Sequence, residues 1–93
     1  MRPQECEYVG HFVKALTNPL RLRILCVLQE GERSVTEIVA RTGAKQANVS
    51  IQLGVLRSRG IVSPRRSENS VLYSIVDPRV TQLLDLMLDI SSS

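Results

Sequence analysis

Apolar residues recur every three or four positions along most of this chain, which is the spacing of amphipathic helices. This pattern predicts helices over residues 4–17, 19–29, 35–41, 46–59 and 78–90. Before the last of these, apolar and polar residues alternate and predict two short strands within residues 61–76. The expected order is therefore four helices, a β-hairpin and a final helix.

Local start and stop signals separate these elements. Asn18 and Asp77 each precede a proline. An Asn or Asp followed by proline is typical of a helix start. The Asn or Asp side chain accepts hydrogen bonds from the free N–H groups of the first turn, and proline has no N–H to leave unpaired. Ser34 and Glu37 match the capping box of a third helix, and Gly43 suits the tight turn after it. The fold class predicted is a mainly α winged helix-turn-helix with a small β-hairpin.

The chain is expected to form a single domain over residues 1–93, since 93 residues leave no room for a second module. Residues 34–59 would form the helix-turn-helix and residues 61–76 the wing. The last helix carries more apolar residues than a small core can use. It is therefore predicted to form a homodimer interface with the first helix, over residues 78–90 and 4–17. A small-molecule pocket between these helices is the alternative.

Positive charge is concentrated in one third of the chain. Residues 38–67 contain six Lys or Arg and no Asp or Glu, whereas the rest has six Lys or Arg against nine Asp or Glu. Binding of a cationic segment to a polyanion is favourable because it releases the counterions condensed on the polyanion. The predicted partner is double-stranded DNA.

The second helix of a helix-turn-helix enters the major groove near its N-terminal end. Gln and Asn side chains pair with adenine there, and Ser contacts several base edges. Arginines on the helix end and the hairpin would meet phosphates or the minor groove. The expected DNA-binding residues are Lys45, Gln46, Asn48, Ser50, Ile51, Arg57, Arg65 and Arg66. A solvated helix face, and charges that keep an edge strand from aggregating, are the simpler alternatives.

Four segments carry a family resemblance. ALTNPLRLRIL at residues 15–25 resembles the ALA(N/D)PxRLxIL stretch of the ArsR/SmtB family of bacterial repressors. SVTEI at 34–38 resembles the third helix of that family, QANVSIQLGVLR at 46–57 its QSAVSQHLKVLR recognition helix, and GIV at 60–62 its GLV. The resemblance covers about residues 12–90. It implies a homodimeric repressor that binds an inverted-repeat operator and is released by an inducer.

The chain also departs from the family pattern. Lys45 stands where a capping Ser is usual, and Gln52 and Gly54 replace the usual His and Lys. The operator preference of relatives therefore cannot be carried over. A glycine inside a helix costs about 1 kcal/mol relative to alanine, which indicates either close packing or tolerance at Gly54.

The familiar metal sites of the family are missing. Its arsenic and cadmium type uses cysteines of the third helix, where this chain has Ser34 and Thr36. Its zinc and cobalt type uses an Asp-x-His pair, of which only Asp77 matches, and a helix cap explains that residue better. No cofactor is expected. The weak metal candidates are Cys6, Glu7 and His11, and solvated surface residues are the simpler interpretation.

Cys26 completes an RLRILC segment that resembles the RLxILC of a thiol-sensing branch of the family, which detects sulfide, persulfide or oxidants. The second cysteine of that branch lies in the last helix, but residues 80–90 contain none, so Cys6 would have to replace it. The simplest interpretation is a small buried thiol between Leu25 and Val27. Redox or sulfur sensing and metal binding stay open, and the inducer is unknown.

Composition argues against other classes of protein. One histidine, no Gly-rich phosphate loop and no Cys/His/Asp set at catalytic spacing argue against an enzyme. No apolar run reaches about 18 residues, so no membrane contact and a cytoplasmic location are expected. The predicted function is a dimeric DNA-binding transcriptional repressor. A winged-helix module that binds protein is the alternative.

Overall fold

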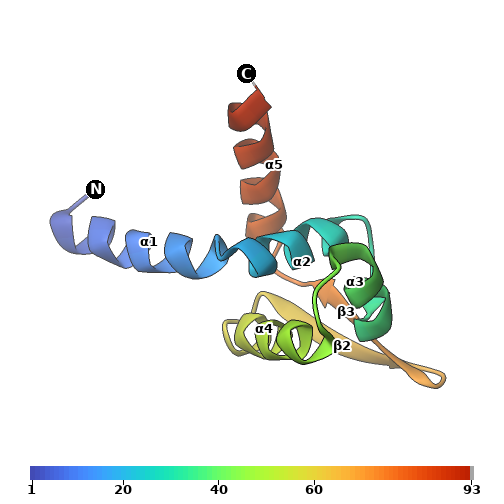
Figure 1. Cartoon of the computed structure of the whole chain (residues 1–93). Helices are drawn as coiled ribbons and strands as arrows, with labels where there is room; N and C mark the ends of the chain where they lie inside the picture. The colour runs from blue at the N-terminus through green and yellow to red at the C-terminus, as the bar shows by residue number, and fades with distance from the viewer. Residues whose placement is uncertain (93) are drawn as a thin grey trace.

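The computed structural model describes residues 1–92, and Ser93, the last residue of the expected domain, lies outside them. The elements are α1 (Pro3–Leu16), α2 (Pro19–Gln29), β1 (Arg33–Ser34), α3 (Val35–Thr42), α4 (Gln46–Ser58), β2 (Val62–Ser67), β3 (Ser70–Ile75) and α5 (Pro78–Ser92) (Figure 1). The predicted helices and hairpin are confirmed, with bounds that differ by one or two residues. The winged helix-turn-helix fold is confirmed with them.

The sheet of the wing has one strand more than predicted. Strand β1 pairs antiparallel with β3, which gives the order β1-β3-β2. The prediction missed β1 because two residues are too few for an alternating pattern, and their partner strand lies far along the chain. At the tip, Ser67 pairs with Ser70, and Glu68 between them has a positive φ of 53°. The extra strand attaches the wing to the start of α3.

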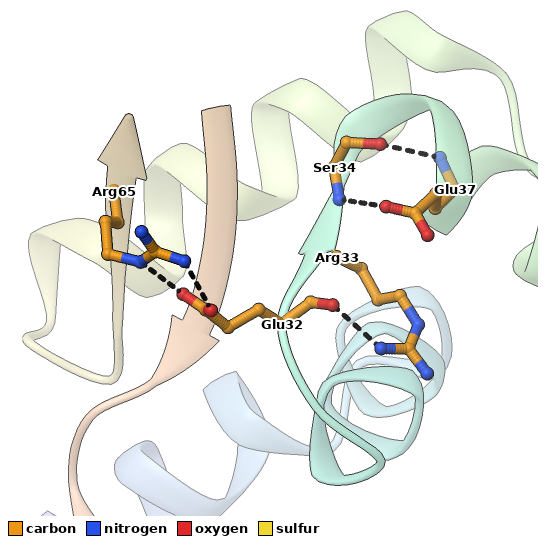
Figure 2. Close-up of polar contacts among 5 residues, drawn as sticks. All are labelled: Glu32, Arg33, Ser34, Glu37 and Arg65. Carbon is orange, nitrogen blue, oxygen red and sulfur yellow. Dashed lines mark hydrogen bonds and ion pairs between the residues drawn. The ribbon is translucent and has the colours of Figure 1, made fainter. Parts of the chain in front are cut away.

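The predicted caps explain where the helices begin. Asn18 Oδ1 accepts hydrogen bonds from two N–H groups of α2 at 3.1 and 3.2 Å. The capping box of α3 joins Ser34 and Glu37 by bonds of 3.0 and 3.2 Å (Figure 2). Asp77 Oδ1 accepts from the first turn of α5 at 3.0 Å. Gly43 ends α3 in the left-handed conformation, with φ 72°.

One apolar core lies among α2, α3, α4 and the sheet. The predicted inward face of α4 is buried, and Ile38 of α3 is buried opposite it. Among residues 1–92, no polar or charged residue is fully buried. The buried residues are Leu16, Ile24, Leu25, Leu28, Ile38, Val49, Leu53, Leu56, Ile61, Val62, Val80 and Leu84.

Helices α1 and α5 project from this core (Figure 1). Leu16 is the one buried residue of α1, and the buried residues of α5 lie in its first half. The exposed large apolar residues of these helices are Tyr8, Val9, Val13, Leu86, Leu88 and Ile90. None of the helices within residues 1–92 has the length and apolarity of a membrane span.

Candidate nucleic-acid interface

Helix α4 presents the predicted contact residues to solvent. Its apolar residues Val49, Leu53 and Leu56 face the core, so the opposite side of the helix is free. In Figure 1, α4 lies on the other side of α2 from α5. Exposed side chains on α4 and at its start are those of Lys45, Gln46, Ala47, Asn48, Ser50, Ile51, Arg57 and Ser58.

The polar residues of α4 form two flanks rather than one face. Successive helical residues are about 100° apart, so Gln46 and Asn48 differ by roughly 200° around the axis. Ser50 lies on the Gln46 side, and Ile51 lies between the flanks. Within residues 1–92 the side chains of Gln46, Asn48 and Ser50 make no hydrogen bond. Their polar groups are available to a partner molecule.

A partly buried hydrogen bond between two side chains holds α4 against α2. Arg21 Nε donates to Gln52 Oε1 at 2.5 Å, and Arg21 Nη1 donates to the Ala15 carbonyl at 2.8 Å. One guanidinium therefore connects the end of α1, the start of α2 and the middle of α4. Sequence reasoning noted Gln52 only as a departure from the family pattern and missed this positioning role.

The start of α4 lacks a side-chain cap. Lys45 occupies the N-cap position and makes no capping hydrogen bond, in contrast to Ser34 at the start of α3. The first N–H groups of a helix carry partial positive charge when they are uncapped. Here the Lys45 ammonium adds to that charge. The start of α4 therefore favours an anion.

The two wing arginines differ in their surroundings. Arg65 donates from Nε and Nη2 to the two carboxylate oxygens of Glu32 at 2.9 and 2.8 Å (Figure 2). The hydrogen bonds lower the pKa of Glu32 and raise the pKa of Arg65. Arg66 is exposed and makes no ion pair within residues 1–92.

Glu32 was missed as a part of this site. It lies 33 residues from Arg65 along the chain, and no local pattern in the sequence connects the two. Arg65 therefore cannot be regarded as a free cation, because any phosphate would have to compete with the carboxylate of Glu32.

Not all of the basic block is available to a polyanion. Arg41 forms an ion pair with Glu30, and Arg65 is paired as described. Arg59 lines a groove of about 540 Å³ next to α1 and α5. Four of the six cations make no ion pair in the described chain, and they lie at the two ends of α4 and on β2. They are Lys45, Arg57, Arg59 and Arg66.

Cys26 is exposed, so the prediction of a buried thiol was wrong. Ile24, Leu25 and Leu28 occupy the core side of α2. Cys26 follows Leu25 by about 100° around the helix and therefore turns toward α5. It lines a groove of about 320 Å³ between α2 and α5, together with Met87.

The candidates on α1 do not assemble a site within one chain. Cys6, Glu7 and His11 are exposed, and Cys6 is a free thiol like Cys26. Residues 1–92 contain no group of three His, Cys, Asp or Glu side chains that could hold a metal ion. Asp77 caps α5 and pairs with Arg79, and these contacts lower its pKa. Its predicted role as a helix cap is confirmed.

A solvent-facing second helix, preceded by a tight turn and followed by a β-wing, defines the winged helix-turn-helix class of transcriptional regulators. Residues 18–63 match the family described as "Bacterial regulatory protein, arsR family". The chain belongs to this family, as its similarity to the following relatives also shows. The predicted resemblance is confirmed.

The chain is 46% identical over 76 residues to an HTH-type transcriptional regulator of Mycobacterium tuberculosis, covering 81% of this chain and 67% of that protein. The crystal structure of that regulator has a TM-score of 0.85 at 38% identity and covers 99% and 92% of the two chains. The biofilm growth-associated repressor of Xylella fastidiosa is 39% identical over 82 residues, covering 88% and 72%.

A third similar structure bears on assembly. It is the homodimeric winged helix-turn-helix DNA-binding domain of a possible ArsR-family regulator from Mycobacterium bovis. Its TM-score is 0.79 at 30% identity, with 99% of this chain and 88% of that chain covered. The family and these relatives are transcriptional regulators and not enzymes.

Proposed function

We propose that this protein is a homodimeric transcriptional repressor that binds an inverted-repeat DNA operator and is released by an inducer. One observation carries the proposal: unpaired polar and cationic side chains surround the free side of α4 and continue onto β2. No acidic residue occurs between positions 38 and 67 to oppose a polyanion there. Similarity to proteins named as repressors supports the same function.

The contact residues divide into two roles. Gln46, Asn48 and Ser50 would read base edges in the major groove, since their side chains are free and suited to it. The cations Lys45, Arg57 and Arg66 would contact phosphates, which position a protein without reading sequence. Arg65 would join them only by exchanging the Glu32 carboxylate for a phosphate.

The projecting helices would form the dimer. Several of their exposed large apolar residues, among them Tyr8, Leu86 and Leu88, lie outside the core cluster. A two-fold axis through such an interface would set two copies of α4 about 34 Å apart, one turn of DNA. The homodimeric Mycobacterium bovis relative supports this assembly.

Release would act through Cys26. Its thiol is exposed at the groove between α2 and α5, where a modification would press on the proposed dimer helix. Because α1 carries Cys6 away from α2 within one chain, an oxidant would form a disulfide between Cys26 of one subunit and Cys6 of the other, taking up two electrons and two protons from the thiols. The weak metal candidates Cys6, Glu7 and His11 would need ligands from a second chain.

The decisive experiment measures binding to the protein's own promoter fragment and to random DNA at several salt concentrations. Gln46→Ala or Asn48→Ala should reduce preference for the operator by about 1–3 kcal/mol. The matched variant Arg66→Ala should lower the affinity for both DNA fragments equally and reduce the dependence of binding on salt. No preference at any salt would reject the repressor and favour a module that binds protein. If the protein instead activates a reporter gene driven by that promoter, repression would be rejected while DNA binding would stand.

The release step has a separate test. Mass spectrometry and operator binding are measured after exposure to persulfide, oxidant or metal ions. We expect a modified Cys26 and weaker binding, and no response in Cys26→Ser. Cys6→Ser is the control: loss of the oxidant response in both variants indicates the disulfide. Unmodified cysteines with unchanged binding would reject every mechanism that uses them.

A further inference from the structure

Ile51 is an exposed apolar side chain on the free side of α4. Its side chain is 61% exposed and belongs to no cluster of the core. Of its neighbours one turn away, Ala47 and Gly54 have little or no side chain, Asn48 is polar and Val55 is half-buried, and a Cβ atom at Gly54 would meet no atom within 4 Å. Ile51 is therefore the exposed large apolar residue of α4.

The surroundings of Ile51 indicate what it contacts. Helix α5 lies on the other side of α2 from α4 (Figure 1), and Ile51 is not among the apolar residues that pack with α1 and α5 against the core. Side-chain amide and hydroxyl groups without hydrogen bonds flank it on α4. The surrounding segment, residues 38–67, carries Lys and Arg residues but no Asp or Glu. Its partner must combine negative charge with a small exposed apolar group. In the major groove of DNA that group is the 5-methyl of thymine.

We propose that Ile51 is a specificity-determining residue that contacts the 5-methyl group of one thymine in each operator half-site. This inference rests on the proposed function, because it requires α4 to lie in the major groove. The missing side chain at Gly54 has a role in the same contact. Packing within the chain does not require glycine there. The lack of a side chain at Gly54 lets the helix approach the DNA closely enough for Ile51 to reach the bases.

The test removes a single methyl group from the DNA. The operator is first selected from random duplexes by the wild-type protein, and each thymine is then replaced by uracil, which keeps the same hydrogen-bonding edge. We expect one position per half-site at which uracil weakens binding about four-fold, or about fifteen-fold when both half-sites are changed.

Variants assign this effect to the residue. Ile51→Ala should bind the thymine operator more weakly and respond no longer to uracil, and its circular dichroism should show an intact fold. Arg66→Ala should lose affinity but keep the full uracil effect. Normal operator preference without any uracil effect would overturn the inference and leave the proposed function intact. Failure to select any operator would overturn both.

Discussion

The central unit from α2 to β3 and the two projecting helices use their apolar residues in opposite ways. In the central unit, Leu53 and Leu56 are 1% exposed, and the polar residues of α4 face solvent. In the projecting helices, Leu88 of α5 is 67% exposed and Tyr8 of α1 is 80% exposed. The core of the centre is filled within one chain, with Leu16 of α1 and Val80 and Leu84 of α5 at its edge, whereas the outer parts of the projecting helices present a surface that a second molecule would cover. Folding and assembly can therefore be disturbed separately.

The largest expected effect comes from the core. Leu53→Ala removes a buried side chain and should lower the free energy of unfolding by about 2–5 kcal/mol, because it leaves a cavity. The matched variant Leu86→Ala, on exposed α5 surface, should cost less than about 1 kcal/mol in dilute protein. Urea unfolding measures both. Equal losses would contradict the separation of centre and projecting helices.

The next effect concerns assembly. Leu88→Lys puts a charge on the exposed surface of α5 and should weaken dimerisation by about ten- to a hundred-fold for each of the two copies in the dimer, the value of burying one leucine. Sedimentation equilibrium measures the dissociation constant, and circular dichroism should show an intact fold. Gln82→Lys adds the same charge at an exposed polar position of α5 and is the control. An unchanged dimer in Leu88→Lys would mean that the interface lies elsewhere.

A third prediction contrasts two helix starts within the centre. Lys45→Ser supplies the cap that α4 lacks and should raise stability by about 0.5–2 kcal/mol while weakening DNA binding. Ser34→Ala removes the cap of α3 and should lower stability by a similar amount without altering the affinity of the folded protein for DNA. Thermal unfolding and DNA titration measure the two quantities. Lys45→Ser with undiminished DNA binding would exclude Lys45 from the interface.

A smaller effect is expected at the wing. Glu32→Gln removes the carboxylate that holds Arg65, so DNA affinity should rise by about two- to five-fold, with a steeper salt dependence. Glu68→Gln makes the same change of charge at the wing tip, where the carboxylate holds no arginine, and is the control. If the two variants bind DNA alike, release of Arg65 contributes nothing beyond the change in net charge.

The smallest effect is the response of stability to acid. Hydrogen bonds with Ser34 and Arg79 lower the pKa of Glu37 and Asp77; Glu37 is exposed and Asp77 is half-buried. A lowered pKa stabilises the fold above the ordinary carboxyl range near pH 4, and this contribution is lost as pH falls through the lowered value. Melting temperature should therefore decline below about pH 4. Glu37→Gln, which keeps a capping group, should show a shallower decline, and an identical slope would contradict this linkage.

The sequence predicted what neighbouring residues determine. Asn18, Ser34 and Asp77 begin helices through contacts within a few residues, so the element bounds were nearly correct. Features that join distant parts of the chain were missed: strand β1, and the pair between Glu32 and Arg65. Exposure of Cys26 was also missed, since helical spacing ranks residues around α2 but does not reveal how much of that surface α5 covers.

The turn at the wing tip has a consequence for how such a regulator can diverge. Glu68 has a positive φ, which favours glycine, and Ser67 and Ser70 pair on either side of the turn. Glycine at this position would relieve the backbone and remove one negative charge from the wing. Such a change leaves the residues of α4 untouched. During evolution, substitutions at this turn could therefore change the strength of repression while the recognised DNA sequence stays the same.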